Sequence, residues 1–201
     1  MSALMFSQRT VRGWIGFLLL LPAFPLAAQG QYTYETNWDD TLTLTGYSGP
    51  GGAVVIPSNI AGRTVVHVYN SVFDLKTNLT SVTIPATIRD SAGLFFYGCT
   101  RLTSISVDTN NPDYWSENGV LFGLESIDHV PTLMRYPPGK TNATYAIPAG
   151  TISNIAVYAF SDCANLREIT VPGNMTYIGE AAFEDCPGLT GVTLPAGLTG
   201  I

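Results

Sequence analysis

The sequence predicts a solenoid of stacked repeats, because one pattern of residues is written twice at a fixed period near the C-terminus. The period is 23 residues, measured from Phe160 to Phe183. The matching pairs are Phe160 and Phe183, Asp162 and Asp185, Cys163 and Cys186, Leu166 and Leu189, Thr170 and Thr193, Pro172 and Pro195, Thr176 and Thr199, and Ile178 and Ile201. A period between about 20 and 50 residues is typical of solenoids, in which each repeat contacts only its neighbours.

Six apolar runs predict the strands of this array, and each run ends on a Pro or, once, on an Asp. The ends fall at positions 57, 85, 108, 148, 172 and 195. Hydrophobic residues make up 46% of the 201-residue chain and charged residues 12%, which supplies enough apolar side chains for a continuous core. We therefore expect repeats over residues 53–201, with one interruption where the spacing between ends rises to 40.

The first 30 residues have the features of a secretory signal peptide. Arg9 and Arg12 provide a positive start, and residues 14–21 form an apolar run that is followed by prolines and small residues. The sequence predicts cleavage after Ala28 or Gly30, and hence a secreted or cell-surface protein with no membrane span after cleavage. An uncleaved anchor is the alternative, although the uncharged segment has 16 residues and a membrane-spanning helix requires about 20.

Residues 31–52 are expected to form an N-terminal cap that consists of a hairpin and a turn. Thr alternates with Tyr or Leu on both sides of residues 37–40, which is typical of two half-exposed strands. Pro50, Gly51 and Gly52 then predict a turn. A hairpin at this end would shield the first core layer of the array from water.

The long spacing predicts an insertion at about 109–145 that leaves the array as a β-hairpin. Residues 119–122 and 132–136 are strand-like, and turn residues stand at 110–112 and 137–139. The insertion carries three aromatic residues that we take as candidates for contact with a partner: Tyr114, Trp115 and Tyr136. The alternative is that these rings only pack the hairpin onto the array.

Within one repeat, the apolar residues at fixed offsets are expected to point inward. In the best-formed unit these are Phe160, Cys163, Leu166, Ile169, Val171 and Ile178. The Ser and Thr residues between them predict an outward ladder, since hydroxyl and β-branched neighbours pack well across strands. Ser91 takes the apolar position before Phe96, so the second unit is expected to be looser.

The three cysteines occupy one place in the repeat, three residues after an aromatic residue and three before a Leu. They are Cys99, Cys163 and Cys186. We expect buried, unpaired thiols that serve as core residues. A disulfide between Cys163 and Cys186 is the alternative that secretion permits, although side chains of stacked layers point the same way and the number of cysteines is odd.

The composition argues against several classes of activity. The net charge is -6, or -8 without Arg9 and Arg12, and no cluster of Lys and Arg is present, so no nucleic-acid partner is expected. The two histidines, His67 and His129, lack the spacing of metal ligands. The sequence contains no nucleophile elbow and no recognisable pairing of carboxylates or Ser, His and Asp. It therefore predicts no catalytic residues, no metal and no cofactor.

Residues 178–195 resemble the BspA-type leucine-rich repeat, whose motif is approximately Ile-Gly-x-x-Ala-Phe-x-x-Cys-x-x-Leu-x-x-Ile-x-Ile-Pro. Ile178-Gly179-Glu-Ala-Ala182-Phe183 matches the first half of this motif without a gap. The resemblance covers roughly residues 53–201, including the insertion. It implies a curved, right-handed, β-rich leucine-rich repeat solenoid with a parallel sheet on the concave face and short helical or irregular convex segments.

The resemblance also implies a protein that is secreted or displayed on a cell surface, where some members of the family act as adhesins. We expect non-enzymatic binding of a protein or glycan partner. The alternatives are a structural spacer or envelope-matrix repeat within a longer polypeptide, with no specific ligand, or an enzyme whose catalytic domain lies beyond the sequence. The last repeat is incomplete at Ile201, so the array is expected to be truncated there.

Overall fold

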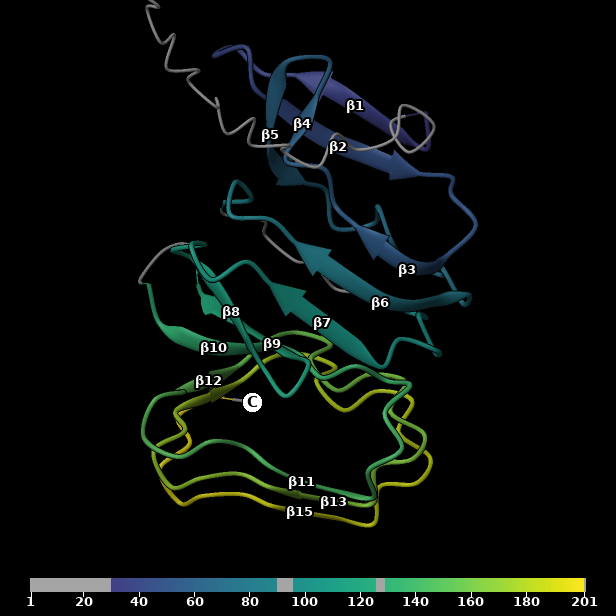
Figure 1. The fold of residues 1–201 in the computed structure, drawn as a ribbon. Helices are drawn as coiled ribbons and strands as arrows, with labels where there is room; N and C mark the ends of the chain where they lie inside the picture. Colours follow the sequence, from purple (N-terminus) through teal and green to yellow (C-terminus); the bar gives the residue numbers. More distant parts are fainter. Residues whose placement is uncertain (1–29, 90–95, 126–128, 201) are drawn as a thin grey trace, which may run out of the picture.

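The fold was analysed in a computed structural model that describes residues 30–89, 96–125 and 129–200. The predicted signal peptide and Ser91 lie outside the described residues. The described residues form strands β1 to β15 joined by turns and loops, and none of them lies in a helix (Figure 1). The fold is therefore a β-solenoid, and the connections that were expected to be helical or irregular are irregular.

The N-terminal cap is a hairpin, as the sequence predicts. Its strands are β1 (Tyr32–Thr36) and β2 (Leu42–Tyr47), which pair antiparallel with a register shift after Thr33. The cap sheet is completed by β4 (Asn59–Ile60) and β5 (Arg63–Val68), in the order β1-β2-β5-β4. Since β2 and β5 run parallel, the cap passes directly into the first turn of the array.

The six predicted strands are all present, but they form two parallel sheets. The first sheet contains β3 (Gly52–Val55), β6 (Leu79–Ile84) and β7 (Ser104–Val107). The second contains β11 (Thr144–Ala146), β13 (Glu168–Thr170) and β15 (Gly191–Thr193). Their alternating side chains follow the prediction, since Ile169 between its neighbours is buried whereas Glu168 and Thr170 are exposed.

The segment between the two sheets corrects the prediction that a hairpin leaves the array. The structure places β8 (Tyr114–Glu117), β9 (Val120–Leu124) and β10 (Pro131–Arg135) in one antiparallel meander. However, β10 also pairs parallel with β12 (Asn154–Ile155), which pairs in turn with β14 (Tyr177–Ile178). The returning arm is therefore part of the array, because Leu133 lies in register with Ile155 and shares its core.

The core is divided in the same way, so the array consists of two blocks. The first block has a core cluster under the first sheet and the cap, and the second block has another under the second sheet. Aromatic rings stack from turn to turn in both. In the first block the ladder runs through Tyr32, Tyr47, Phe73 and Phe96, with ring centroids 5.0 to 5.5 Å apart. In the second it runs through Tyr136, Phe160 and Phe183, with centroids 5.5 and 5.4 Å apart. Tyr136 thus takes the place of the repeat Phe.

The cysteines lie beside this ladder and are free thiols. Cys99 Sγ donates to the carbonyl oxygen of Phe73 at 2.9 Å, and Cys186 Sγ donates to that of Phe160 at 3.0 Å. Burial raises the pKa of Cys99 to about 11. The prediction of a buried core thiol is confirmed for Cys99 and Cys163, whereas Cys186 in the last turn is only half-buried.

Candidate functional site

The three aromatic residues predicted from the insertion do not form one exposed patch. Tyr114 is 4% exposed and Tyr136 is 1% exposed, so their rings belong to the core. Trp115 is half-buried, and its ring stacks on Phe122 with a centroid distance of 5.8 Å. Partner binding by these residues stays a prediction. Their burial agrees with the alternative that the rings pack the meander onto the array.

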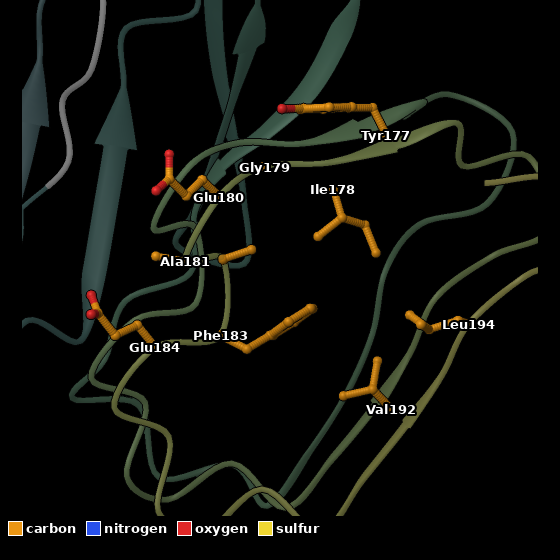
Figure 2. Close-up of a pocket in the computed structure, with 10 residues that line it drawn as sticks. Tyr177, Ile178, Gly179, Glu180, Ala181, Phe183, Glu184, Val192 and Leu194 are labelled. Atoms are coloured by element: carbon orange, nitrogen blue, oxygen red, sulfur yellow. The ribbon is translucent and has the colours of Figure 1, made fainter. Parts of the chain in front are cut away.

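A hollow with a volume of about 730 Å³ lies at the C-terminal end of the array. Figure 2 shows Ile178, Phe183, Val192 and Leu194 converging on it, while the carboxylate of Glu184 points away. These apolar residues repeat those that form the core one turn earlier: Phe160 is fully buried, but Phe183 is only half-buried. The hollow is therefore the uncovered face of the last described core layer, and its lining also includes Tyr177, Glu180 and Glu184.

A buried arginine joins the two blocks of the array. Arg135 at the end of β10 is fully buried, and its guanidinium donates to the carbonyl oxygen of Phe96 at 3.2 Å, to the carbonyl oxygen of Tyr158 and to Ser161 Oγ at 2.7 Å. Its Nη2 also lies 3.7 Å from the carboxylate of Asp162. Burial lowers the pKa of Arg135, because the charged form loses its hydration.

Asp162 completes this polar junction from the other side. Its carboxylate accepts from the backbone N–H of Gly98 at 3.0 Å and from Ser161 Oγ at 3.4 Å. The sequence shows Asp162 only as a position that repeats at 23 residues, whereas the structure gives it contacts in both blocks. Arg135 was not singled out, because a lone Arg at the end of a strand carries no pattern. The junction holds the fold together and has little accessible surface.

One large aromatic side chain is fully presented to solvent. Trp38 stands at the tip of the β1–β2 hairpin and is 98% exposed. Trp and Tyr rings combine a large apolar area with a polar group, and they are enriched where proteins bind partners. Sequence reasoning passed over Trp38, although a Trp within a turn of Asn and Asp residues is a signal that could have identified it.

The turn that carries Trp38 is held by a network of hydrogen bonds. Asn37 N donates to the carbonyl oxygen of Thr41 at 2.8 Å, and Asn37 Nδ2 donates to Thr41 Oγ1 at 2.8 Å. Thr41 Oγ1 donates to Asp39 Oδ1 at 2.6 Å, and this bond lowers the pKa of Asp39. Arg63 Nε lies 2.9 Å from the carboxylate of Asp40. The backbone around Trp38 is thus fixed before any partner arrives.

Across residues 30–89, 96–125 and 129–200, no group of three or more His, Cys, Asp or Glu side chains is placed to hold a metal ion. In the same ranges, no helix has the length and the apolar character that crossing a bilayer requires.

The repeat sequence decides the family. The model of the BspA-type leucine-rich repeat region matches six copies, over residues 55–118 and 140–201. The chain belongs to this BspA-type family. The gap in the match contains β9 and β10, where the meander departs from the repeat. The family motif has a physical basis here: a Cβ on Gly179 would lie 2.4 Å from the backbone nitrogen of Val157, so only glycine lets this BspA-type turn approach the preceding one.

Solved structures of other leucine-rich repeat proteins resemble this BspA-type array. A protein from Eubacterium ventriosum aligns with a TM-score of 0.52 and 20% identity, covering 85% of this chain and 66% of that one. The leucine-rich repeat protein of T. pallidum aligns with a TM-score of 0.48 and 26% identity, covering 84% and 71%. A leucine-rich cell surface protein from Faecalibacterium prausnitzii aligns with a TM-score of 0.45 and 17% identity, covering 85% and 76%. The first of these supports the fold. A comparison with curated proteins gives no significant match.

Proposed function

We propose that this chain is a secreted or surface-displayed leucine-rich repeat protein that binds a protein or glycan partner and catalyses no reaction. Membership of the family supports a rigid repeat scaffold, on which function resides in particular surface residues. The predicted signal peptide supports export.

The exposed Trp38 carries the binding part of this proposal. A Trp ring buries about 150–250 Å² when it is covered, and each Å² is worth about 25 cal/mol, so its burial by a partner would contribute about 4 to 6 kcal/mol before the costs of association. The hydrogen-bonded turn reduces one of those costs, because the loop need not be ordered on binding. Trp38 therefore has both the area and the preorganisation of an anchor residue.

A binding screen with matched variants tests this role. The full chain would be presented multivalently to extracellular-matrix proteins and a glycan panel, alongside Trp38→Ala, Trp38→Tyr and Trp115→Ala. Val55→Thr is the control, because Val55 is 45% exposed on β3 and the substitution removes apolar character with little change in shape. We expect Trp38→Ala to weaken binding at least tenfold, Trp38→Tyr to restore part of it and Val55→Thr to have no effect.

Two outcomes would contradict the proposal. Unchanged binding by folded Trp38→Ala would remove Trp38 as the anchor, and loss in Trp115→Ala would then return the site to the meander. Absence of saturable binding to every probe, by protein shown to be folded by circular dichroism, would favour the alternative of a structural spacer.

A further inference from the structure

A second surface lies along the side of the array, where residues of both blocks meet. It is a groove of about 390 Å³ lined by Asp74, Tyr97, Tyr158 and Glu184, and we call it the acidic tyrosine groove. Its four residues come from four separate turns, so only the stacked fold brings them together. The groove does not include Trp38, so ligand binding there does not depend on the proposed role of that residue.

Two tyrosine rings form the wall of the groove at the block boundary. Tyr97 and Tyr158 have centroids 5.7 Å apart and an interplanar angle of 64°, which is an edge-to-face pair. Both residues are half-buried and are held through their backbones. Tyr97 N donates to Asp74 Oδ1 at 3.2 Å, and Tyr158 N donates to the carbonyl oxygen of Glu180 at 3.2 Å. An edge-to-face pair is asymmetric, because one ring offers its edge to the face of the other and retains an electron-rich face of its own.

Two of the four residues that line the groove, Asp74 and Glu184, have carboxylate side chains. The charges of Glu184, Asp162 and Asp185 raise the pKa of Tyr97, because these carboxylates repel the negative charge that the phenolate would carry. Figure 2 shows the Glu184 carboxylate extended away from the apolar end of the array. It is therefore directed outward from the core, where it can meet a ligand of the groove.

Asp74, which also lines the groove, carries a charge that its surroundings balance incompletely. The residue is half-buried, and burial raises the pKa of its carboxyl group against the opposing effects of the Tyr97 N–H and Arg135. Arg135 is already committed to Asp162 and to three other acceptors. A half-buried carboxylate in this position is stabilised by any cation that enters the groove.

We propose that the acidic tyrosine groove binds a cationic side chain of a partner protein, with an arginine guanidinium lying over the ring of Tyr97 between Asp74 and Glu184. A guanidinium is planar, so it can stack on an aromatic face while its N–H groups donate to carboxylates. The more strongly hydrated, point-like ammonium of lysine fits this combination less well. Anionic ligands are repelled by the same carboxylates that attract arginine.

An NMR titration of the full chain tests the proposal with a defined probe, N-acetyl-arginine amide. The neutral isostere N-acetyl-citrulline amide is the matched ligand control. We expect the arginine probe to cause saturable shifts of the Tyr97, Gly98 and Glu184 amide resonances. The citrulline probe should bind with an apparent affinity at least tenfold lower. The corresponding lysine probe should bind with an affinity between those of the arginine and citrulline probes, and added salt should weaken the binding of both cationic probes.

Matched variants locate the site. Glu184→Gln and Tyr97→Leu should each reduce affinity at least fivefold, whereas Tyr97→Phe, which keeps the aromatic face, should retain it. Glu168→Gln is the control for loss of an exposed carboxylate, because Glu168 lies on β13 outside the groove. Equal binding of arginine and citrulline would overturn the proposal. So would equal effects of Glu184→Gln and Glu168→Gln, since these would reveal only attraction to the net charge of the chain.

Discussion

Replacing Arg135 by Met is expected to destabilise the protein strongly, because the guanidinium is the polar link between the two blocks. The substitution keeps a long side chain at the end of β10 but removes every donor. It leaves two backbone carbonyl oxygens, those of Phe96 and Tyr158, without their guanidinium partner, and it leaves the Asp162 carboxylate without its counter-ion.

The expected loss of unfolding free energy depends on the burial of the Arg135 and Asp162 charges rather than on the distance between them. The carbonyl oxygens of Phe96 and Tyr158 each keep a backbone N–H donor, from Cys99 and Ser161, so the main loss is that of the buried ion pair, and removal of one member of such a pair typically costs about 3–5 kcal/mol. The side chain of Asp162 is 15% exposed and keeps the N–H of Gly98, so water and that bond relieve part of its loss. We therefore expect Arg135→Met to lower the free energy of unfolding by about 3–5 kcal/mol, which lowers the melting temperature by about 6–20 °C.

Urea unfolding monitored by circular dichroism measures this loss, and a surface ion pair supplies the control. Arg63 and Asp40 are closer, at 2.9 Å, but their side chains are 46% and 72% exposed, so Arg63→Met should cost no more than about 1 kcal/mol. Because Arg135 contacts both blocks, Arg135→Met should also separate unfolding into two transitions. A loss for Arg135→Met that is within 1 kcal/mol of the loss for Arg63→Met would refute the reasoning.

Three further predictions follow from single residues. Asn111→Ala removes donors to two carbonyl oxygens and an acceptor for two N–H groups and should cost about 2–4 kcal/mol in urea unfolding; a loss under 1 kcal/mol would contradict this. Asp74→Asn should stabilise the protein at pH 7 but not at pH 2.5. The pKa of the Asp74 carboxyl group is raised in the folded state, so the unsubstituted protein loses stability as the pH rises through that pKa; an effect of the substitution that does not change with pH would exclude the Asp74 charge as its cause. Tyr136→Phe should raise stability by about 1 kcal/mol, because Tyr136 Oη is buried and has no partner among the described atoms; thermal destabilisation would show that it has one.

Periodicity predicted the parts of the fold in which one turn repeats the next. Ile169 and its neighbours were assigned to the inside or the outside correctly, since alternation and a 23-residue period fix both the face and the layer of a strand residue. The cap hairpin was predicted for a similar reason, because two alternating runs around a polar turn form a local pattern.

The meander could not be predicted in the same way, because its position in the array depends on contacts between distant turns. Tyr136 follows its strand residue Leu133 by three positions, whereas Phe160 follows Ile155 by five, so the shared core position is hidden by a shorter connection. Aromatic residues in a non-repetitive stretch look available, but Tyr114 and Tyr136 are buried and Trp115 is half-buried.

The two candidate surfaces escaped the sequence for different reasons. Trp38 lies in a turn of Asn and Asp residues, a local signal that was passed over, and its 98% exposure is known only from the structure. Tyr97 and Tyr158 are far apart in sequence and meet only because the two blocks are joined at the meander. Repeat sequences predict the scaffold well, whereas features that occur once in the array require coordinates.

The polar junction has a consequence for how such a gene can change length. Within β11 to β15 every turn presents the same backbone spacing and the same stacked ring to the next, so duplicating or deleting one whole unit there reproduces an interface that already exists. Asp162 recurs as Asp185, but Arg135 has no such copy, and a rearrangement that separates Arg135 from Asp162 would leave a guanidinium unpaired in the interior. Growth and loss of repeats should therefore concentrate beyond the junction, leaving the cap with Trp38 and the first block as the constant part of the molecule.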